Sequence, residues 1–215
     1  YLNLNLNPRF KTNPPEKIRI FNPYEKEEVK RIVKNFYKKF FNDSNKRIFI
    51  FGINPGRFGG GLTGISFTDP VALKEYCGIE NNLGSKKELS SKFIYNVIME
   101  YGGAKKFFSN FYLTALFPLP ILLNDKNYNY YDNAELLKKL KPYLEDSFRQ
   151  QVLFGADRNS AFSLGNRNYK FLKEINERHN YFKEIKVLHH PRYIMQYKQK
   201  QVKKYVEEYL NNFQK

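Results

Sequence analysis

The sequence predicts an α/β fold, a three-layer α/β/α sandwich in which a central, four-stranded, mostly parallel sheet lies between two layers of helices. Four short apolar runs, rich in β-branched and aromatic residues, have the composition of buried strands. Between them lie longer stretches whose apolar residues recur at helical spacing. Strands that alternate with helices are joined by crossovers, which make the sheet parallel and cover both of its faces.

The first quarter of the chain contains an irregular arm, one helix and one strand. Residues 1–24 carry four prolines and little periodicity, so we expect an irregular N-terminal arm. Residues 25–41 place apolar side chains at helical spacing, namely Val29, Ile32, Val33, Phe36, Tyr37 and Phe40. The run 47–53, RIFIFGI, predicts a buried parallel strand that ends abruptly at Asn54-Pro55-Gly56.

The rest of the chain continues the alternation of helices with strands. A glycine-rich, irregular stretch at 54–84 comes first, and a loop is expected at 118–133. The predicted helices cover 90–103, 134–154 with an interruption at Pro142, 168–179 and 193–213. The predicted strands cover 106–116, 160–165 and 184–190. The chain has no internal repeat and no linker, so the sequence predicts a single domain over residues 1–215.

Composition narrows the class of protein. Hydrophobic residues make up 41% of the 215 residues and aromatic ones 17%, which is enough for a folded core. The chain has 37 Lys and Arg against 21 Asp and Glu, and its net charge of +16 favours a polyanionic partner, nucleic acid or an anionic membrane surface. Its one cysteine excludes an internal disulfide framework and a four-cysteine zinc or iron–sulfur site.

The sequence has no pattern typical of a membrane span or of an export signal. It holds no run of about 18 uncharged apolar residues. The first residues, YLNLNLNPRF, lack the charged start followed by an apolar stretch that marks a signal peptide. We therefore expect a cytoplasmic location, in the bacterial cytosol or nucleoid, and no membrane partner.

A parallel sheet of this kind binds ligands beyond the carboxyl ends of its strands. That rule selects the segment after Ile53, the strand near Asn110 and the segment after Leu188. The segment 52–67, GINPGRFGGGLTGISF, has no Lys-Ser/Thr after its glycines and lacks the dinucleotide spacing, so a nucleoside triphosphate or NAD has little support. Asn54 can hold a water or a ligand atom, and Phe67 can stack on a ligand or join the core.

This segment resembles the first motif of the uracil-DNA glycosylase superfamily, specifically of the single-strand-selective monofunctional uracil-DNA glycosylase (SMUG-like) family. That family shows Asn-Pro-Gly-x-Phe-Gly and then Thr-Gly-x-x-Phe. The residues that match at the right spacing are Asn54, Pro55, Gly56, Phe58, Gly59, Thr63, Gly64 and Phe67. The resemblance covers about residues 47–197 and implies a uracil-DNA glycosylase-like fold, in agreement with the predicted sheet.

Two further positions fit the resemblance. Asn110 interrupts the apolar run FFSNFYL, and the corresponding strand of a similar enzyme carries an asparagine whose amide pairs with uracil N3–H and O4. His190-Pro191 matches the start of the second motif. The usual continuation, Ser-Pro-Arg-Asn-Pro, is replaced here by RYIMQ, so the loop that wedges into DNA is rebuilt. His189 and His190 are strand neighbours that face opposite sides, so at most one of them faces the site.

The resemblance implies a hydrolase that flips uracil out of DNA and removes it, leaving an abasic site in base excision repair. In this scheme Asn54 holds the attacking water, and neutral His190 hydrogen-bonds uracil O2 as negative charge develops there. Phe67 stacks on the base and Asn110 selects uracil over cytosine. Gly56 leaves room beside C5, so 5-hydroxymethyluracil is accepted as well. The chemistry needs no catalytic lysine, metal or other cofactor, so we expect a monofunctional enzyme.

The basic residues beside the second motif are expected to contact DNA phosphates. The stretch 192–204 is rich in Lys and Arg and holds no acidic residue. The candidate DNA-contacting residues are Arg57, Arg192, Tyr193, Ile194, Lys198 and Lys200. The expected partner is single-stranded or duplex DNA that contains uracil, and we expect the protein to act as a monomer.

Three other functions remain open at this stage. A non-catalytic basic module could bind lesions or single strands, although Asn54 and His190 retain the groups that the chemistry needs. A mismatch-specific uracil or thymine glycosylase shares Asn-Pro-Gly, but that family has Asn in place of His at the second motif. An unrelated nucleotide-handling enzyme can use the same fold, because fold alone does not fix function.

Overall fold

The computed structural model describes residues 18–214, which form the α/β/α sandwich that the sequence predicts. Its central sheet contains β2 (Arg47–Gly52), β3 (Phe111–Ala115), β6 (Ala156–Leu164) and β7 (Glu184–Leu188). The strand order is β3-β2-β6-β7 and every pair is parallel. The chain leaves β2 toward β3 on one side and returns to β6 on the other, so the strand order reverses between β2 and β6. Such a reversal opens a crevice at the carboxyl ends of the strands.

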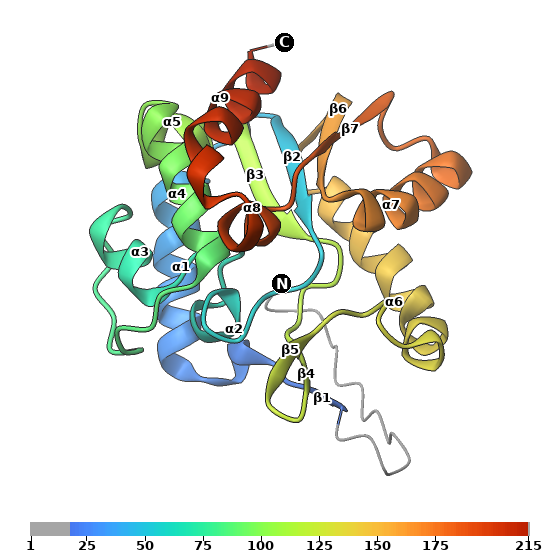
Figure 1. The fold of residues 1–215 in the computed structure, drawn as a ribbon, viewed down its shortest axis with the longest axis horizontal. Helices are drawn as coiled ribbons and strands as arrows, with labels where there is room; N and C mark the ends of the chain where they lie inside the picture. Colours follow the sequence, from blue (N-terminus) through green and yellow to red (C-terminus); the bar gives the residue numbers. More distant parts are fainter. Residues whose placement is uncertain (1–17, 215) are drawn as a thin grey trace.

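Helices cover both faces of this sheet, and Figure 1 shows the two layers on either side of it. One layer contains α1 (Glu27–Phe40), α4 (Leu89–Glu100), α5 (Ala104–Asn110) and α9 (Val202–Phe213). The other layer contains α6 (Ala134–Val152) and α7 (Asn166–His179). Shorter helical turns lie in the connections, namely η1 (Pro23–Glu25), α2 (Gly60–Thr63), α3 (Pro70–Glu75), α8 (Pro191–Tyr197) and η2 (Gln199–Gln201). No helix within residues 18–214 is long and apolar enough to cross a bilayer.

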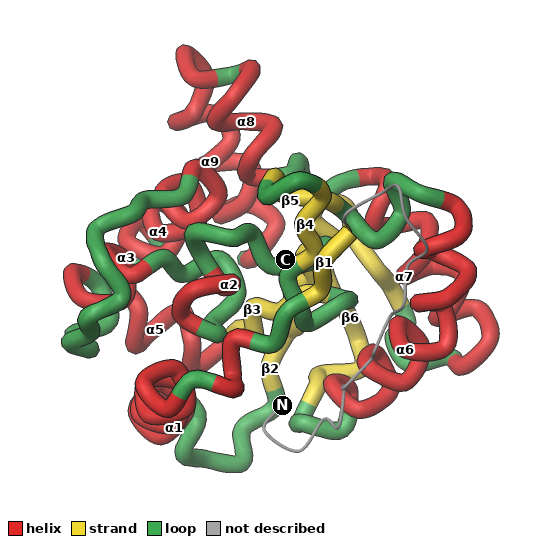
Figure 2. Tube along the Cα trace, turned by 90° about the horizontal axis from the view of Figure 1, so that it is seen from below, coloured by secondary structure: helices red, strands yellow, loops and turns green. Residues whose placement is uncertain are grey.

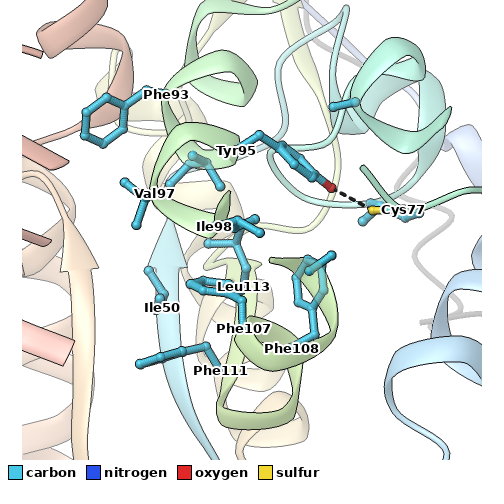
Figure 3. Packing of buried hydrophobic residues seen from close by; sticks show 14 of the residues in the cluster. Ile50, Cys77, Phe93, Tyr95, Val97, Ile98, Phe107, Phe108, Phe111 and Leu113 are labelled. Atoms are coloured by element: carbon cyan, nitrogen blue, oxygen red, sulfur yellow. Dashed lines mark hydrogen bonds between the residues drawn. The ribbon is translucent and has the colours of Figure 1, made fainter. Parts of the chain in front are cut away.

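The alternation of side chains along β2 divides the core into two apolar clusters. Ile50 faces the layer of α4 and α5, where Figure 3 shows it close to Leu113, Phe107 and Phe111. Its neighbours Phe49 and Phe51 face the opposite layer, where they join the apolar side chains of α6 and α7. A strand buried on both faces explains why β2 is apolar from Ile48 to Gly52.

A second, smaller sheet corrects two expectations from the sequence. Residues 118–133 contain β4 (Ile121–Leu123) and β5 (Lys126–Tyr128) instead of a loop only. They are joined by a tight turn in which Asn124 and Asp125 both have positive φ, a conformation that favours Asn and Asp. β1 (Ile18–Ile20) pairs antiparallel with β4, so residues 18–24 are not simply irregular, whereas residues 1–17 of the expected arm lie outside the described residues. Figure 2 shows the three strands side by side.

Three boundaries also differ from the sequence prediction. Residues 104–110 form the helix α5, so the predicted strand 106–116 is β3 alone, preceded by a helix. The C-terminal helix 193–213 is divided into α8, η2 and α9. In contrast, α6 continues through Pro142 without interruption. The aromatic residues of 106–112 fit a strand by composition, but Ser109 and Asn110 both hydrogen-bond the Lys106 carbonyl oxygen and complete the last turn of a helix.

Asn168 on α7 holds the crevice edge together. Its side chain is 0% exposed, and its Nδ2 donates to the carbonyl oxygens of Phe51 and Gly52, both at 3.1 Å. Its Oδ1 accepts a hydrogen bond from the Tyr130 hydroxyl at 2.8 Å. The amide thereby joins the last residues of β2 to α7 and to the segment after β5.

We predict that Asn168→Ala lowers the free energy of unfolding by about 2–4 kcal/mol, because buried polar partners lose their hydrogen bonds. The exposed Asn166 on the same helix provides the control, and Asn166→Ala is expected to change stability by less than about 0.5 kcal/mol. Urea denaturation of both variants measures the difference. Equal midpoints for the two variants would show that the Asn168 amide does not hold this edge.

Candidate functional site

A pocket of about 810 Å³ lies at the carboxyl ends of the central strands. Residues after β2, β6 and β7 line it, among them Asn54, Gly165 and His190. Ala115, the last residue of β3, and Asn127 of β5 line it as well. The pocket therefore occupies the crevice that the reversal of strand order opens, and the small sheet closes one of its sides.

Asn54 carries an unpaired acceptor inside this pocket. Its Nδ2 donates to the Tyr128 carbonyl oxygen at 3.0 Å, which fixes the orientation of the amide. Its Oδ1 is buried and has no hydrogen-bond partner among the described residues. A buried acceptor left unpaired costs about 1–3 kcal/mol. The oxygen is therefore placed to accept a hydrogen bond from a water or a ligand.

The turn after Asn54 is compact and is tied to the small sheet. The Gly56 carbonyl oxygen accepts from the backbone N–H of Gly61 at 2.9 Å, and the Arg57 N–H donates to Asn127 Oδ1 at 2.9 Å. A Cβ added to Gly56 would lie 1.8 Å from Glu88 Oε1. The expectation of open space beside Gly56 is therefore wrong, because the carboxyl group of Glu88 occupies it.

Phe67 presents its ring to the pocket at the end of β2. A Cβ on Gly52 would lie 2.5 Å from the ring atoms Cε2 and Cζ of Phe67, so the strand can approach the ring only at a glycine. Phe67 itself has a φ of 56°, an uncommon conformation for an aromatic residue. Its ring centroid lies 6.3 Å from that of His190. The two rings belong to opposite ends of the sequence and meet in one site.

His190 caps α8 and carries a defined proton. Its Nδ1 accepts a hydrogen bond from the Arg192 backbone N–H at 3.1 Å. Burial lowers the pKa of the imidazole from 6.5 to about 4, and the Arg192 guanidinium lowers it further in the same direction. The ring is therefore neutral near neutral pH, and because Nδ1 is an acceptor, the proton resides on Nε2. Nε2–H remains available to donate to a ligand.

The neighbouring His189 contacts α9 and α8. Its Nδ1 lies 2.9 Å from Glu208 Oε1 on α9, and its ring stacks on Tyr193 with 6.4 Å between centroids. Its carbonyl oxygen accepts a hydrogen bond from the Tyr209 hydroxyl. These contacts attach the end of β7 to α9 and leave His190 as the histidine beside Phe67.

Asn110 does not lie in this pocket, which corrects the expectation that it reads the base. It is the last residue of α5, exposed, and its Nδ2 donates to the Lys106 carbonyl oxygen at 2.9 Å. It precedes β3, whereas the pocket lies after Ala115 at the other end of that strand. Five residues of strand separate the two ends by about 16 Å. The mistake follows from assigning residues 106–110 to the strand.

Several polar residues of the pocket were missed by the sequence analysis, chiefly Glu88, Asn127, Asn129 and Asn168. They come from segments that the sequence assigned to loops or to a helix away from the strand ends. Their local sequences carry no motif, because only the folded chain brings β5, α7 and the start of α4 to the crevice.

Of the residues predicted to contact DNA, only Arg192 and Tyr193 line the pocket. Arg192 and Tyr193 are exposed on α8, with Tyr193 42% exposed, and Lys200 is exposed on η2. Lys198 is half-buried. Ile194 is 0% exposed within the core, so the expectation that it touches DNA is wrong.

Arg57 lies on the turn after β2 and is committed to neighbouring groups. Its guanidinium carbon lies 4.3 Å from the centre of the Phe58 ring, and its Nη1 donates to the Asp125 carbonyl oxygen. These contacts keep the positive charge at the junction of the glycine turn and the small sheet.

The comparisons with known proteins agree with this geometry. The model of the uracil DNA glycosylase superfamily matches residues 38–214. The crystal structure of wild-type SMUG2 from Pedobacter heparinus superposes with a TM-score of 0.89 and 43% sequence identity, over 94% of this chain and 89% of that one. No curated protein matches significantly. The match spans the sheet, both helical layers and the pocket, and the chain belongs to the uracil DNA glycosylase superfamily, as a SMUG-like member.

Proposed function

We propose that this protein is a monofunctional DNA glycosylase that removes uracil, and C5-modified uracil such as 5-hydroxymethyluracil, from DNA. The observation that carries the proposal is the pairing of two groups in one pocket. Asn54 offers a buried acceptor without a partner, and His190 offers an Nε2–H on a neutral ring. An acceptor for water and a donor for an oxyanion are the two groups that hydrolysis of an N-glycosidic bond requires.

The base reaches the pocket by leaving the DNA stack. Flipping a nucleotide costs a few kcal/mol and is easiest in single strands or at mismatches. The Phe67 ring lies at the end of β2, where stacking on the flipped base repays about 1–3 kcal/mol. The exposed cations Arg192, which lines the pocket, and Lys200, on η2 after α8, bind the flanking phosphates.

Cleavage of the bond places positive charge on the sugar and negative charge on the base. The bond between C1′ and N1 breaks with its electron pair on the base, and His190 Nε2–H hydrogen-bonds O2 as charge accumulates there. Asn54 Oδ1 accepts a hydrogen bond from a water whose oxygen bonds C1′. An amide has no useful proton affinity, so Asn54 orients the water but does not take its proton, which passes to solvent.

Two polar side chains beside the glycine turn form a polar wall that affects which bases the pocket accepts. Glu88 and Asn127 lie beside Gly56, where the resemblance puts the C5 edge of the base. A hydroxymethyl group can hydrogen-bond to such a wall, directly or through water. A methyl group would displace water and leave polar groups unpaired.

The first prediction concerns the two catalytic groups. On an oligonucleotide with one uracil, we expect Asn54→Ala and His190→Ala each to slow base release by about two to three orders of magnitude. His190→Ala also loses the cap of α8, about 1 kcal/mol of stability. His189→Ala is the matched control and is expected to slow release by less than tenfold. Alkaline cleavage of the abasic product measures release. A larger loss in His189→Ala than in His190→Ala would show that His189, and not His190, hydrogen-bonds the base.

The second prediction concerns the substrate range. We expect the native protein to release both uracil and 5-hydroxymethyluracil, and to leave thymine in place, because only the hydroxyl can bond to the wall beside Gly56. Oligonucleotides that carry each base singly, as single strands and as duplexes, measure this. Release of uracil without any release of 5-hydroxymethyluracil would restrict the function to uracil.

The third prediction concerns DNA binding. Replacing Lys198 and Lys200 by Gln is expected to flatten the slope of log affinity against log salt by up to about 2 units, since each phosphate contact contributes about 0.9. Lys105 and Lys106 on α5, at the amino end of β3, provide the control pair and are expected to leave the slope unchanged. Fluorescence anisotropy with a labelled duplex measures it. Equal slopes in both double variants would mean that Lys198 and Lys200 do not touch the DNA.

A further inference from the structure

Glu88, which immediately precedes α4, inserts its carboxyl group into the turn after β2. Its Oε1 and Oε2 lie 1.8 Å and 1.9 Å from the positions that a Cβ would occupy on Gly56 and Gly59. A side chain at either position would fit only if the Glu88 carboxyl group moved aside. The two glycines of the motif therefore make the space that this acid fills, and the acid lines the same pocket as Asn54 and Phe67.

The backbone of Glu88 is held in place by the side chain of Asp69. Its N–H donates to Asp69 Oδ2 at 2.9 Å, and Asp69 is almost fully buried. The other oxygen of Asp69 accepts from the Ala72 N–H at 2.8 Å and caps α3. The Asp69 N–H donates to Ser91 Oγ at 3.2 Å, on α4. Because Asp69 connects α3 with α4 through Glu88, the backbone from which the carboxyl group reaches the pocket is held in place.

The carboxyl oxygens of Glu88 are available to a ligand. No residue among 18–214 donates a hydrogen bond to them or forms an ion pair with them. The charged groups that act on the carboxyl are Arg192 on α8 and Asp69 below it, and the ring of His190 in the same pocket is neutral. Burial raises the pKa of the Glu88 carboxyl from 4.5 to about 7, with Arg192 opposing the shift and Asp69 adding to it. Protonated and ionised forms are thus both populated near neutral pH.

A base bound between His190 and the glycine turn presents one edge to His190 and the opposite edge to the turn. His190 follows β7 and the turn follows β2, with β6 between them, so the two strand ends are about 10 Å apart. A pyrimidine carries O2 on one side of the ring and C5, flanked by O4, on the other. When O2 faces His190, the edge with O4 and C5 faces the turn that Glu88 fills.

We propose that Glu88 contacts the flipped base and that its protonated carboxyl group donates a hydrogen bond to O4 of uracil, which makes it a specificity-determining residue. This inference rests on the proposed function. Asn110 is absent from the pocket and β3 contributes only Ala115 there, so the base needs another partner for O4. Cytosine presents an amino donor at the same position, which the carboxyl group can accept in either form, whereas only the protonated carboxyl can donate to O4 of uracil. Protonation is therefore what allows Glu88 to bind uracil, and the ionised form favours cytosine.

The pH dependence of uracil release tests the proposal. Below about pH 7 the carboxyl is protonated and donates to O4, whereas above it the carboxylate repels the carbonyl oxygen. We expect single-turnover release by the native protein to fall by up to tenfold for each unit above about pH 7. Glu88→Gln keeps an N–H donor at every pH, so its rate is expected to vary by less than about threefold between about pH 6 and pH 9.

A matched control and a mutation-free measurement accompany this experiment. Glu100→Gln, exposed at the end of α4, is expected to follow the native profile. Inhibition of the native protein by free uracil is expected to weaken over the same range, as the pH rises above about 7 (the alkaline limb of the profile). An alkaline limb shared by the native protein and Glu88→Gln would overturn the proposal, and so would uracil inhibition that stays flat across that range. Absence of uracil release by the native protein at any pH would instead overturn the proposed function.

Discussion

The crevice at the carboxyl ends of the sheet depends on the buried amide of Asn168. Pairing of β2 with β6 ends at Phe51, and there Asn168 Nδ2 donates to the carbonyl oxygens of Phe51 and Gly52, the second of which also accepts from the Leu116 N–H at 2.9 Å. Because the amide also accepts from Tyr130, it fixes the segment that leads from the small sheet to α6. One side chain thereby joins the end of β2, α7 and the segment after β5.

The polar groups of the pocket are positioned by the fold but left unsatisfied by it. Asn54 is oriented through its Nδ2 and keeps a bare Oδ1, His190 is oriented through its Nδ1 and keeps Nε2, and Glu88 is fixed through its backbone. In each case one atom is anchored and another is free. This division gives preorganised donors and acceptors, which are worth more in a partly buried site than the same groups in water.

The sequence predicted the layers of the fold because β2 is a continuous apolar run and the apolar residues of α1 and α9 recur at helical spacing. It also placed Asn54, Phe67 and His190, since each follows or adjoins a strand in a recognisable motif. It failed at α5, whose aromatic residues bury one face of a helix but have the composition of a strand, and this displaced Asn110 to the wrong end of β3. It could not find Glu88, because the contact joins residues 56 and 88 through tertiary structure and no local pattern reports it. The small sheet was missed because three-residue strands have too few residues to show a period.

The relation among Gly56, Gly59 and Glu88 restricts the order in which this part of the chain can change. A substitution at either glycine meets the carboxyl group at once, whereas a shorter residue at position 88 first removes the obstacle. The effect of a side chain at 56 or 59 therefore depends on the residue at 88, because the Glu88 carboxyl group has to move aside to admit it. A directed-evolution search for a narrower pocket gains from varying position 88 together with the two glycines.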